Sequence, residues 1–320
     1  MGSKKEGPDL AVELGPLTLK NPVLAASGTF GYGEEYAGII PLKRLGGMIT
    51  KGLSLEPRKG NPPPRLAETP AGMLNAIGLE NVGIETFLRE KMPFLRKAGC
   101  PVLVNIFGNT EEEYAEMAGR VSDVEGIAGI EVNISCPNLK AGGSLFAADP
   151  KAVYQVISKT RQATSSFLMA KLSPNVADIA KIAVAAEEAG ADAVSLINTL
   201  TGMAIDIRTR TAMLGNITGG LSGPAIKPIG LRMVWQVAQA VAIPVVGIGG
   251  IVAAEDALEY LIAGASAVQV GSAHFIDPRA GVKIIDGIQN YLQRQGLAGI
   301  SSIIGSLKTG QEGRKADTRS

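Results

Sequence analysis

The stretch Pro244-Val245-Val246-Gly247-Ile248-Gly249-Gly250 decides the fold of this chain. It is a short apolar run that ends in two glycines, and a helical pattern follows it at residues 253–263. A continuous apolar run of this length is typical of a parallel strand that is buried on both faces. Seven further β-like runs recur along the chain, most of them followed by a helical pattern: residues 22–26, 47–50, 102–106, 130–134, 167–172, 193–197 and 267–270.

Eight β/α units in one chain predict an α/β fold, a (β/α)8 TIM barrel. The 320 residues suit one such domain, which we expect at residues 1–307, followed by a polar tail at 308–320 that we expect to be disordered. The sequence shows no linker and no second domain. A doubly wound parallel sheet is the alternative fold for the same alternation of strands and helices.

Two helices show clear signals at their ends. Thr110 and Glu113 have the pattern of a capping box, which predicts a helix that runs to Val121. Asn175 is predicted to cap a second helix, and Gly190 is predicted to end it.

Three connections are too long for simple turns: residues 51–81, 135–149 and 198–224. Each follows a predicted strand. Long loops in compact domains are usually functional, and the loops at the carboxyl ends of barrel strands build the active face. We therefore expect the active site among these three loops.

Composition excludes several classes of protein. The net charge is +1 and the Lys and Arg residues do not cluster, which argues against a nucleic-acid or anionic-membrane surface. Two cysteines are too few for a secreted disulfide scaffold, so we expect a cytoplasmic protein. The first nine residues are polar and predict no signal peptide. The most apolar stretch, residues 237–254, contains a glutamine, a proline and three glycines, which argues against a membrane span.

Polar residues stand where nearly every predicted strand ends. They are Ser27, Lys51, Asn105, Asn133, Lys171, Asn198 and Thr199. Burying such a group without a partner costs roughly 1–3 kcal/mol. A polar ligand in the mouth of the barrel would pair with them, so the pattern predicts a binding site there.

A Gly-Gly pair and a Gly-Ser pair follow the last two predicted strands, at Gly249-Gly250 and Gly271-Ser272. Many barrels bind phosphate at this place, because missing side chains let backbone N–H groups reach phosphate oxygens. The alternative is that these glycines only form tight turns.

The two cysteines differ in their position. Cys100 lies at the start of the third predicted strand, and we interpret it as a small buried hydrophobic residue. Cys136 follows the fourth strand, in a loop with Gly142 and Gly143, where a thiol can serve as a base if its pKa is tuned. The alternative is an inert, packed thiol. We interpret His274, the only histidine, as a helix-start or interface residue, and we expect no metal site.

Several motifs together resemble one family. They are Lys51-Gly52, Gly60-Asn61-Pro62, Pro64-Arg65, Asn75-Ala76-Ile77-Gly78-Leu79, Asn133-Ile134-Ser135-Cys136-Pro137-Asn138 and Gly247-Ile248-Gly249-Gly250. In their order and spacing the chain resembles the dihydroorotate dehydrogenases, from about residue 14 to residue 307. Each motif alone is modest evidence, whereas the set is specific.

The resemblance also indicates a subclass. Soluble class 1 enzymes use cysteine as the base and membrane-associated class 2 enzymes use serine, so Cys136 indicates class 1. Residues 68–75 and 138–143 resemble class 1B. Class 1B implies NAD as the final acceptor. It also implies an iron-sulfur/FAD electron-transfer subunit, which carries FAD and a [2Fe-2S] cluster, in a heterotetramer of two copies of each chain. The chain itself has no cysteine set for such a cluster.

The resemblance assigns residues to a cofactor, FMN, and to a substrate, (S)-dihydroorotate. It implies that FMN is bound by Ser27, Lys51, Gly52, Asn105, Asn133, Lys171, Ile197, Gly223, Gly249, Gly250, Gly271 and Ser272. It implies that the substrate is bound by Lys51, Asn75, Ala76, Ile77, Gly78, Leu79, Asn133, Asn138, Asn198 and Thr199. Amides suit this substrate, because a cyclic diamide offers both donors and acceptors.

The implied reaction oxidises dihydroorotate to orotate in de novo pyrimidine (UMP) biosynthesis. Cys136 takes the proton from C5, hydride leaves C6 for flavin N5, and Lys171 stabilises negative charge at the N1/O2 edge of the flavin. Electrons then pass to NAD through the partner subunit. The alternatives are a class 1A-like homodimer that reduces fumarate, a related flavin-dependent dihydropyrimidine dehydrogenase, a Schiff-base lyase that uses Lys171, and a non-catalytic binding module.

Overall fold

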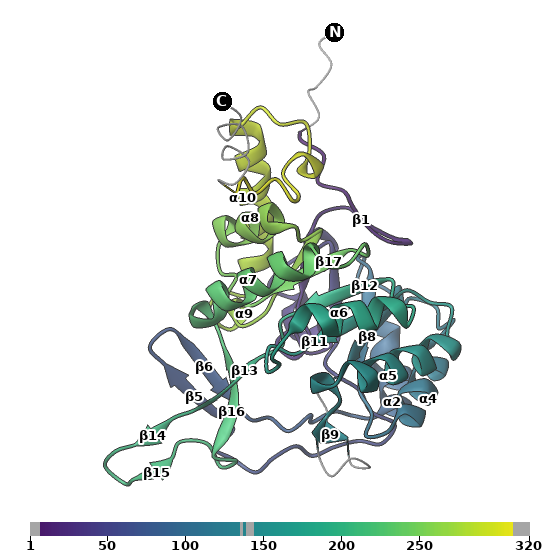
Figure 1. The fold of residues 1–320 in the computed structure, drawn as a ribbon, viewed down its shortest axis with the longest axis vertical. Helices are drawn as coiled ribbons and strands as arrows, with labels where there is room; N and C mark the ends of the chain where they lie inside the picture. Colours follow the sequence, from purple (N-terminus) through teal and green to yellow (C-terminus); the bar gives the residue numbers. More distant parts are fainter. Residues whose placement is uncertain (1–6, 135–136, 139–143, 310–320) are drawn as a thin grey trace, which may run out of the picture.

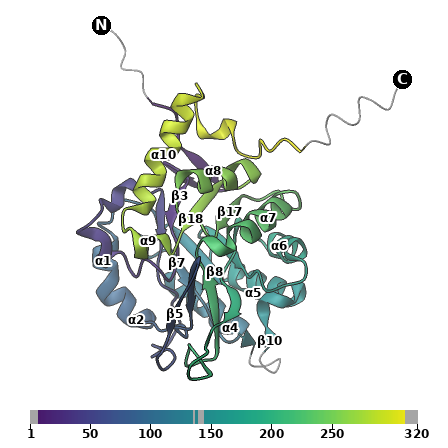
Figure 2. The same cartoon turned by 90° about the vertical axis from the view of Figure 1, so that its left-hand side faces the viewer.

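The computed structural model describes residues 7–134, 137–138 and 144–309. Eight parallel strands close into a barrel that helices surround (Figure 1, Figure 2). In chain order these strands are β3 (Val23–Ala25), β4 (Gly47–Ile49), β7 (Val102–Ile106), β8 (Gly129–Asn133), β11 (Leu168–Leu172), β12 (Ala193–Leu196), β17 (Val245–Ile248) and β18 (Ala267–Val270). The predicted TIM barrel is confirmed. The doubly wound alternative is wrong, because β18 pairs with β3 and closes the sheet.

Burial explains why the strands read as continuous apolar runs. Every residue of β3, β4, β7, β11, β12, β17 and β18 is buried, and only the last residue of β8 is partly exposed. One face of each strand packs inside the barrel and the other packs against helices, so neither face needs polar residues.

The longer helices lie around this barrel. They are α4 (Glu111–Val121), α5 (Pro150–Gln162), α6 (Ile179–Glu188), α7 (Lys227–Ala238), α8 (Ala254–Ala263) and α10 (Ala280–Arg294). The predicted start of α4 is confirmed, since the Glu113 N–H donates to Oγ1 of Thr110 at 3.3 Å. The Glu113 carboxylate, however, accepts from the backbone N–H of Asn109 instead of that of Thr110.

The predicted cap of the next helix is wrong. Asp178 caps α6, because its carboxylate accepts from the N–H groups of Ala180 and Lys181. Asn175 instead donates to the Thr199 carbonyl and accepts from the Thr201 N–H, so it ties the loop after β11 to the loop after β12.

Short helical segments occupy the remaining connections. They are α1 (Glu34–Ala37), η1 (Leu42–Arg44), α2 (Ile84–Thr86), η2 (Phe87–Lys91), α3 (Met92–Leu95), η3 (Phe146–Ala148), η4 (Pro224–Ile226), α9 (Ala273–Ile276) and η5 (Ile300–Ser302). An antiparallel hairpin of β1 (Val12–Leu14) and β2 (Leu17–Leu19) lies at the amino ends of the strands, where its Gly15 turn approaches Asp192, the residue before β12.

Two of the long loops contain strands of their own. β5 (Leu66–Thr69) and β6 (Gly72–Asn75) come from the loop after β4, and β13 (Leu200–Met203) and β16 (Thr218–Ser222) come from the loop after β12. They form one antiparallel sheet in the order β13-β16-β6-β5, which extends from the barrel at lower left in Figure 1. Two small hairpins accompany it: β14 (Ile205–Asp206) with β15 (Thr211–Ala212), and β9 (Pro137–Asn138) with β10 (Ser144–Leu145).

Candidate active site

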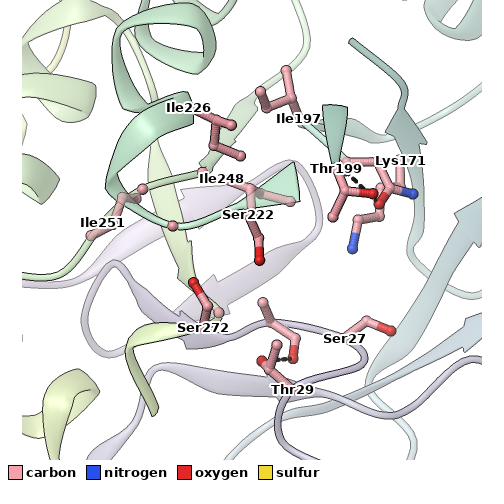
Figure 3. A pocket seen from close by; sticks show the side chains of 16 residues that line it. Ser27, Thr29, Lys171, Ile197, Thr199, Ser222, Ile226, Ile248, Ile251 and Ser272 are labelled. Carbon is pink, nitrogen blue, oxygen red and sulfur yellow. Dashed lines mark hydrogen bonds between the residues drawn. The ribbon is translucent and has the colours of Figure 1, made fainter. Parts of the chain in front are cut away.

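A pocket that is open to solvent lies at the carboxyl ends of the barrel strands, with about 510 Å³ of empty space that includes solvent at its mouth. Lys171 and Thr199 lie on one side of it and Ser272 on the other (Figure 3). It brings together many of the predicted site residues: Ser27, Lys171, Ile197, Asn198, Thr199, Gly223, Gly249, Gly250, Gly271 and Ser272. The sequence did not identify the rest of its lining, which is Ala26, Thr29, Ser222, Ile226, Ile248 and Ile251.

Gly250 and Gly271 line the pocket, and the reason why glycine occupies each position differs. At Gly250 the backbone has φ of 69°, and an added Cβ would lie 2.8 Å from the backbone nitrogen of Lys227, so the turn itself requires glycine. Gly271 is different, because its φ is ordinary and a Cβ would come no closer than 3.7 Å to Ala26 or 3.8 Å to Thr29. Packing therefore does not explain Gly271, and the missing side chain leaves room on the pocket side.

Lys171 is held by a carboxylate inside the barrel. Its side chain is 7% exposed, and its Nζ lies 3.5 Å from Oε1 of Glu131, which has no exposed surface. Oε1 also accepts from Nδ2 of Asn105 at 2.7 Å, and Oε2 accepts from Ser195 Oγ at 3.0 Å and from Gln269 Nε2 at 2.7 Å. Glu131, Ser195 and Gln269 were not among the predicted residues. A charged residue inside the apolar run at 130–134 was the signal that could have identified Glu131.

Two predicted amides lie beside this group. Asn133 ends β8 opposite Lys171 in the register, and its Oδ1 accepts from Nδ2 of Asn198 at 3.4 Å. The Asn133 carbonyl accepts from the Tyr114 hydroxyl at 2.7 Å, which fixes the end of the strand. The Asn198 Oδ1 accepts from the Thr199 N–H at 2.8 Å. Donors and acceptors of amides thus converge next to the lysine.

Other predicted residues lie outside the pocket. Lys51 borders a neighbouring hollow together with Tyr32 and Arg58. Gly52 lies behind Asn105, since a Cβ there would be 2.8 Å from Asn105 Oδ1.

The predicted segment from Asn75 to Leu79 follows β6. Asn75 Nδ2 donates to the Gly220 carbonyl of β16 at 3.2 Å, and the loop beyond it is held by Asn61, which bonds to the Ala76 and Ile77 carbonyls. Gly78 packs on Asn61, and Leu79 adopts φ of 58°. This segment is joined to the pocket through Gly220, which lies against Thr199.

Cys136 lies outside the described residues, and of Asn138 only its place in β9 is described. Cys100 is partly buried against the core just before β7, in agreement with a structural role. Burial raises the pKa of the Cys100 thiol to about 11.

His274 lies in α9, as a helix-start residue, and is 1% exposed. Its ring packs edge-on against Phe30, with ring centroids 4.9 Å apart. Burial lowers the pKa of His274 to about 4, so the ring is neutral at physiological pH.

The described part of the chain contains neither a metal-binding cluster nor a membrane-spanning helix. No group of three or more His, Cys, Asp or Glu side chains there is arranged to hold a metal ion. No helix in the same residues has the length and apolar character that a membrane crossing needs.

Fold and site together define a class. A closed barrel whose pocket combines glycine turns after the last two strands, a buried lysine and convergent amides is typical of enzymes that bind a phosphate-bearing cofactor at the carboxyl face. The chain belongs to the dihydroorotate dehydrogenase family, whose family model matches residues 9–292.

Curated relatives agree with this assignment. Proteins of Geotalea uraniireducens and Pelobacter propionicus are each 58% identical to this chain, and one of Geobacter metallireducens is 57% identical. Each match covers 94% of this chain and 99% of the relative. All three bear the name "Dihydroorotate dehydrogenase B (NAD(+)), catalytic subunit".

Proposed function

We propose that this chain oxidises (S)-dihydroorotate to orotate in pyrimidine biosynthesis, as the FMN-binding catalytic subunit of an NAD-dependent enzyme. The family assignment supports the reaction. The observation that carries it onto this chain is the pocket that joins Lys171 and Asn198 to the glycine turns after β17 and β18.

The residues present fit FMN. Among the described residues, Asn105 Oδ1 and Gln269 Oε1 are buried acceptors without a hydrogen-bond partner. A buried unpaired acceptor is costly, and the flavin ring offers an N–H donor as well as acceptors. Both amides donate to Glu131, the ion-pair partner of Lys171. Lys171 lines the pocket and supplies a donor there, and Gly271 leaves room beside it.

We propose the following roles toward the cofactor. We assign the phosphate to Gly249, Gly250, Gly271 and Ser272, since backbone N–H groups without side chains suit phosphate oxygens. Lys171 would stabilise negative charge on the reduced ring. The remaining proposed FMN contacts are Ser27, Lys51, Gly52, Asn105, Asn133, Ile197 and Gly223. When bound, FMN supplies the acceptor for the hydride that leaves C6 of the substrate.

The substrate would be held by amides and by one cation. We propose Lys51, Asn75, Ala76, Ile77, Gly78, Leu79, Asn133, Asn138, Asn198 and Thr199 as its contacts. Cys136, three residues beyond the end of β8, would take the proton from C5. Lys51 would pair with the carboxylate, because an ammonium is a point charge that suits an anion.

A second subunit would receive the electrons. The relatives are named as catalytic subunits of an NAD(+) enzyme, and such a name implies another subunit. We propose that this partner carries FAD and a [2Fe-2S] cluster and that two copies of each chain form a cytoplasmic heterotetramer. We also propose that residues 1–307 form the single FMN-binding domain.

Anaerobic titration tests the proposal. Purified chain loaded with FMN should be yellow, and dihydroorotate should bleach it without the partner, whereas NAD should reoxidise it only with the partner present. Reoxidation by fumarate without a partner would indicate a class 1A-like enzyme. Bleaching by a dihydropyrimidine but not by dihydroorotate would indicate the related dehydrogenase. A colourless protein that borohydride traps with substrate would indicate a Schiff-base lyase.

A further inference from the structure

Glu131 lies in the interior of the barrel, and no predicted role includes it. It is the third residue of β8, and its side chain has no exposed surface. Transfer of a carboxylate from water to such a site is strongly unfavourable unless each oxygen is paired. An apolar residue is the ordinary occupant of this position in a buried strand, so the carboxylate needs an explanation beyond packing.

The partners of Glu131 come from four different strands. Its Oε1 accepts from Asn105 of β7 and lies 3.5 Å from Nζ of Lys171 of β11, while its Oε2 accepts from Ser195 of β12 and Gln269 of β18. Three hydrogen bonds and one ion pair thus involve the two oxygens, so both are paired and the carboxylate is fixed in orientation.

This arrangement controls which atoms of its neighbours remain available. Asn105 and Gln269 both turn their NH2 groups to Glu131, and their oxygens, Oδ1 and Oε1, have no partner among the described residues. Oδ1 of Asn105 faces Gly52, just beyond the end of β4. Lys171, which lines the pocket, has Glu131 as its counter-ion.

We propose that Glu131 is the positioning residue of the flavin site, which holds the Lys171 ammonium in place at the pocket and fixes the orientation of the Asn105 and Gln269 amides. The inference rests on the proposed function, in which Lys171 contacts FMN. Glu131 acts through its neighbours and does not itself contact the flavin. Its fixed negative charge lies below the pocket, and this charge opposes the gain of electrons by the flavin.

Two substitutions distinguish the effect of the negative charge of Glu131 from the effect of its side-chain length. Glu131→Gln keeps the shape and removes the charge, so the two-electron reduction equilibrium of bound FMN should shift at least tenfold toward reduction, a rise of about 30 mV in midpoint potential. Flavin reduction by dihydroorotate should slow at least tenfold, because Lys171 loses its fixed place. Glu131→Asp keeps the charge and withdraws it by one methylene, so the potential should stay near that of the unchanged chain while reduction still slows.

Asp192→Asn is the matched control. Asp192 also forms a partly buried ion pair, with Arg161 at 3.0 Å, but it precedes β12 at the opposite end of the barrel. This variant should change neither the potential nor the rate.

The measurements use the full chain loaded with FMN, with the potential determined against a reference dye. An unchanged or lowered potential together with an unchanged rate in Glu131→Gln overturns the proposal, as does an equal shift in Asp192→Asn. If Glu131→Gln does not fold, Glu131→Asp decides, and a normal reduction rate in it overturns the proposal. Failure of dihydroorotate to bleach the unchanged chain refutes the proposed function instead, and the dye potentials still test Glu131.

Discussion

One part of the destabilisation that acidification should cause comes from His274. The ring is buried at the start of α9, and neither of its nitrogens has a hydrogen-bond partner within the described residues. Burial lowers its pKa from 6.5 to about 4. Between these values the unfolded chain binds a proton at this site and the folded chain does not, so stability must fall as the pH falls.

The size of this effect follows from the two pKa values. Above pH 6.5 the ring is neutral in the folded and the unfolded chain, so His274 causes no loss in the free energy of unfolding. At 1.36 kcal/mol for each pKa unit, the loss is about 2 kcal/mol by pH 5 and about 3 kcal/mol once the pH is below 4. Below that pH the ring is charged in both states, and His274 contributes no further loss.

Urea denaturation between pH 7.5 and pH 4 measures the effect, because His274 is the only histidine of the chain. The control is His274→Leu, which fills the space beside Phe30 with an apolar side chain that does not titrate. On acidification from pH 7.5 to pH 5, the unfolding free energy of the unchanged chain should fall by about 2 kcal/mol more than that of the variant. Parallel pH profiles for the two proteins would refute the reasoning.

Three further outcomes test the site, and a fourth tests the burial of Cys100. Cys136→Ala should retain FMN and lose about 10²–10⁴-fold in turnover, as expected for a general base, and normal turnover would exclude this role. Lys171→Ala should slow flavin reduction at least about tenfold or weaken FMN binding, measured by stopped flow and by titration; unchanged values for both contradict its role. Gly250→Ala should lower stability by about 1–2 kcal/mol and weaken FMN binding, because an added Cβ would lie 2.8 Å from the nitrogen of Lys227 at a φ of 69°. In the Cys136→Ala chain at pH 8, Cys100 should react with a thiol reagent about 100-fold more slowly than a free thiol, because its pKa is about 11; fast labelling would show that the thiol is not buried.

The barrel could be predicted from the sequence because each of its strands is marked by residues that are adjacent in the chain. Each strand of the barrel is a short apolar run, and burial on both faces produces that run whatever the strand's partner is. The polar residues at the strand ends were equally readable, and many of them line the pocket.

The antiparallel sheet was not predicted, because its pairing is not local. Gly220 of β16 pairs with Asn75 of β6, and the segment Thr218–Ser222 contains two glycines and no apolar alternation. Glu131 was missed for a related reason. It lies inside an apolar run, and its meaning depends on donors from four other strands that only the closed barrel brings together. Asn175 was misassigned because Asp178, three residues later, is an equally good cap.

The seam of the barrel, where β18 pairs with β3, has a consequence for the synthesis of the protein. β3 and β18 are joined although one lies near the start of the chain and the other beyond residue 266. The pocket lies across this seam, with Ala26 on one side and Gly271 on the other. The chain must therefore be synthesised beyond residue 272 before the pocket has all its walls.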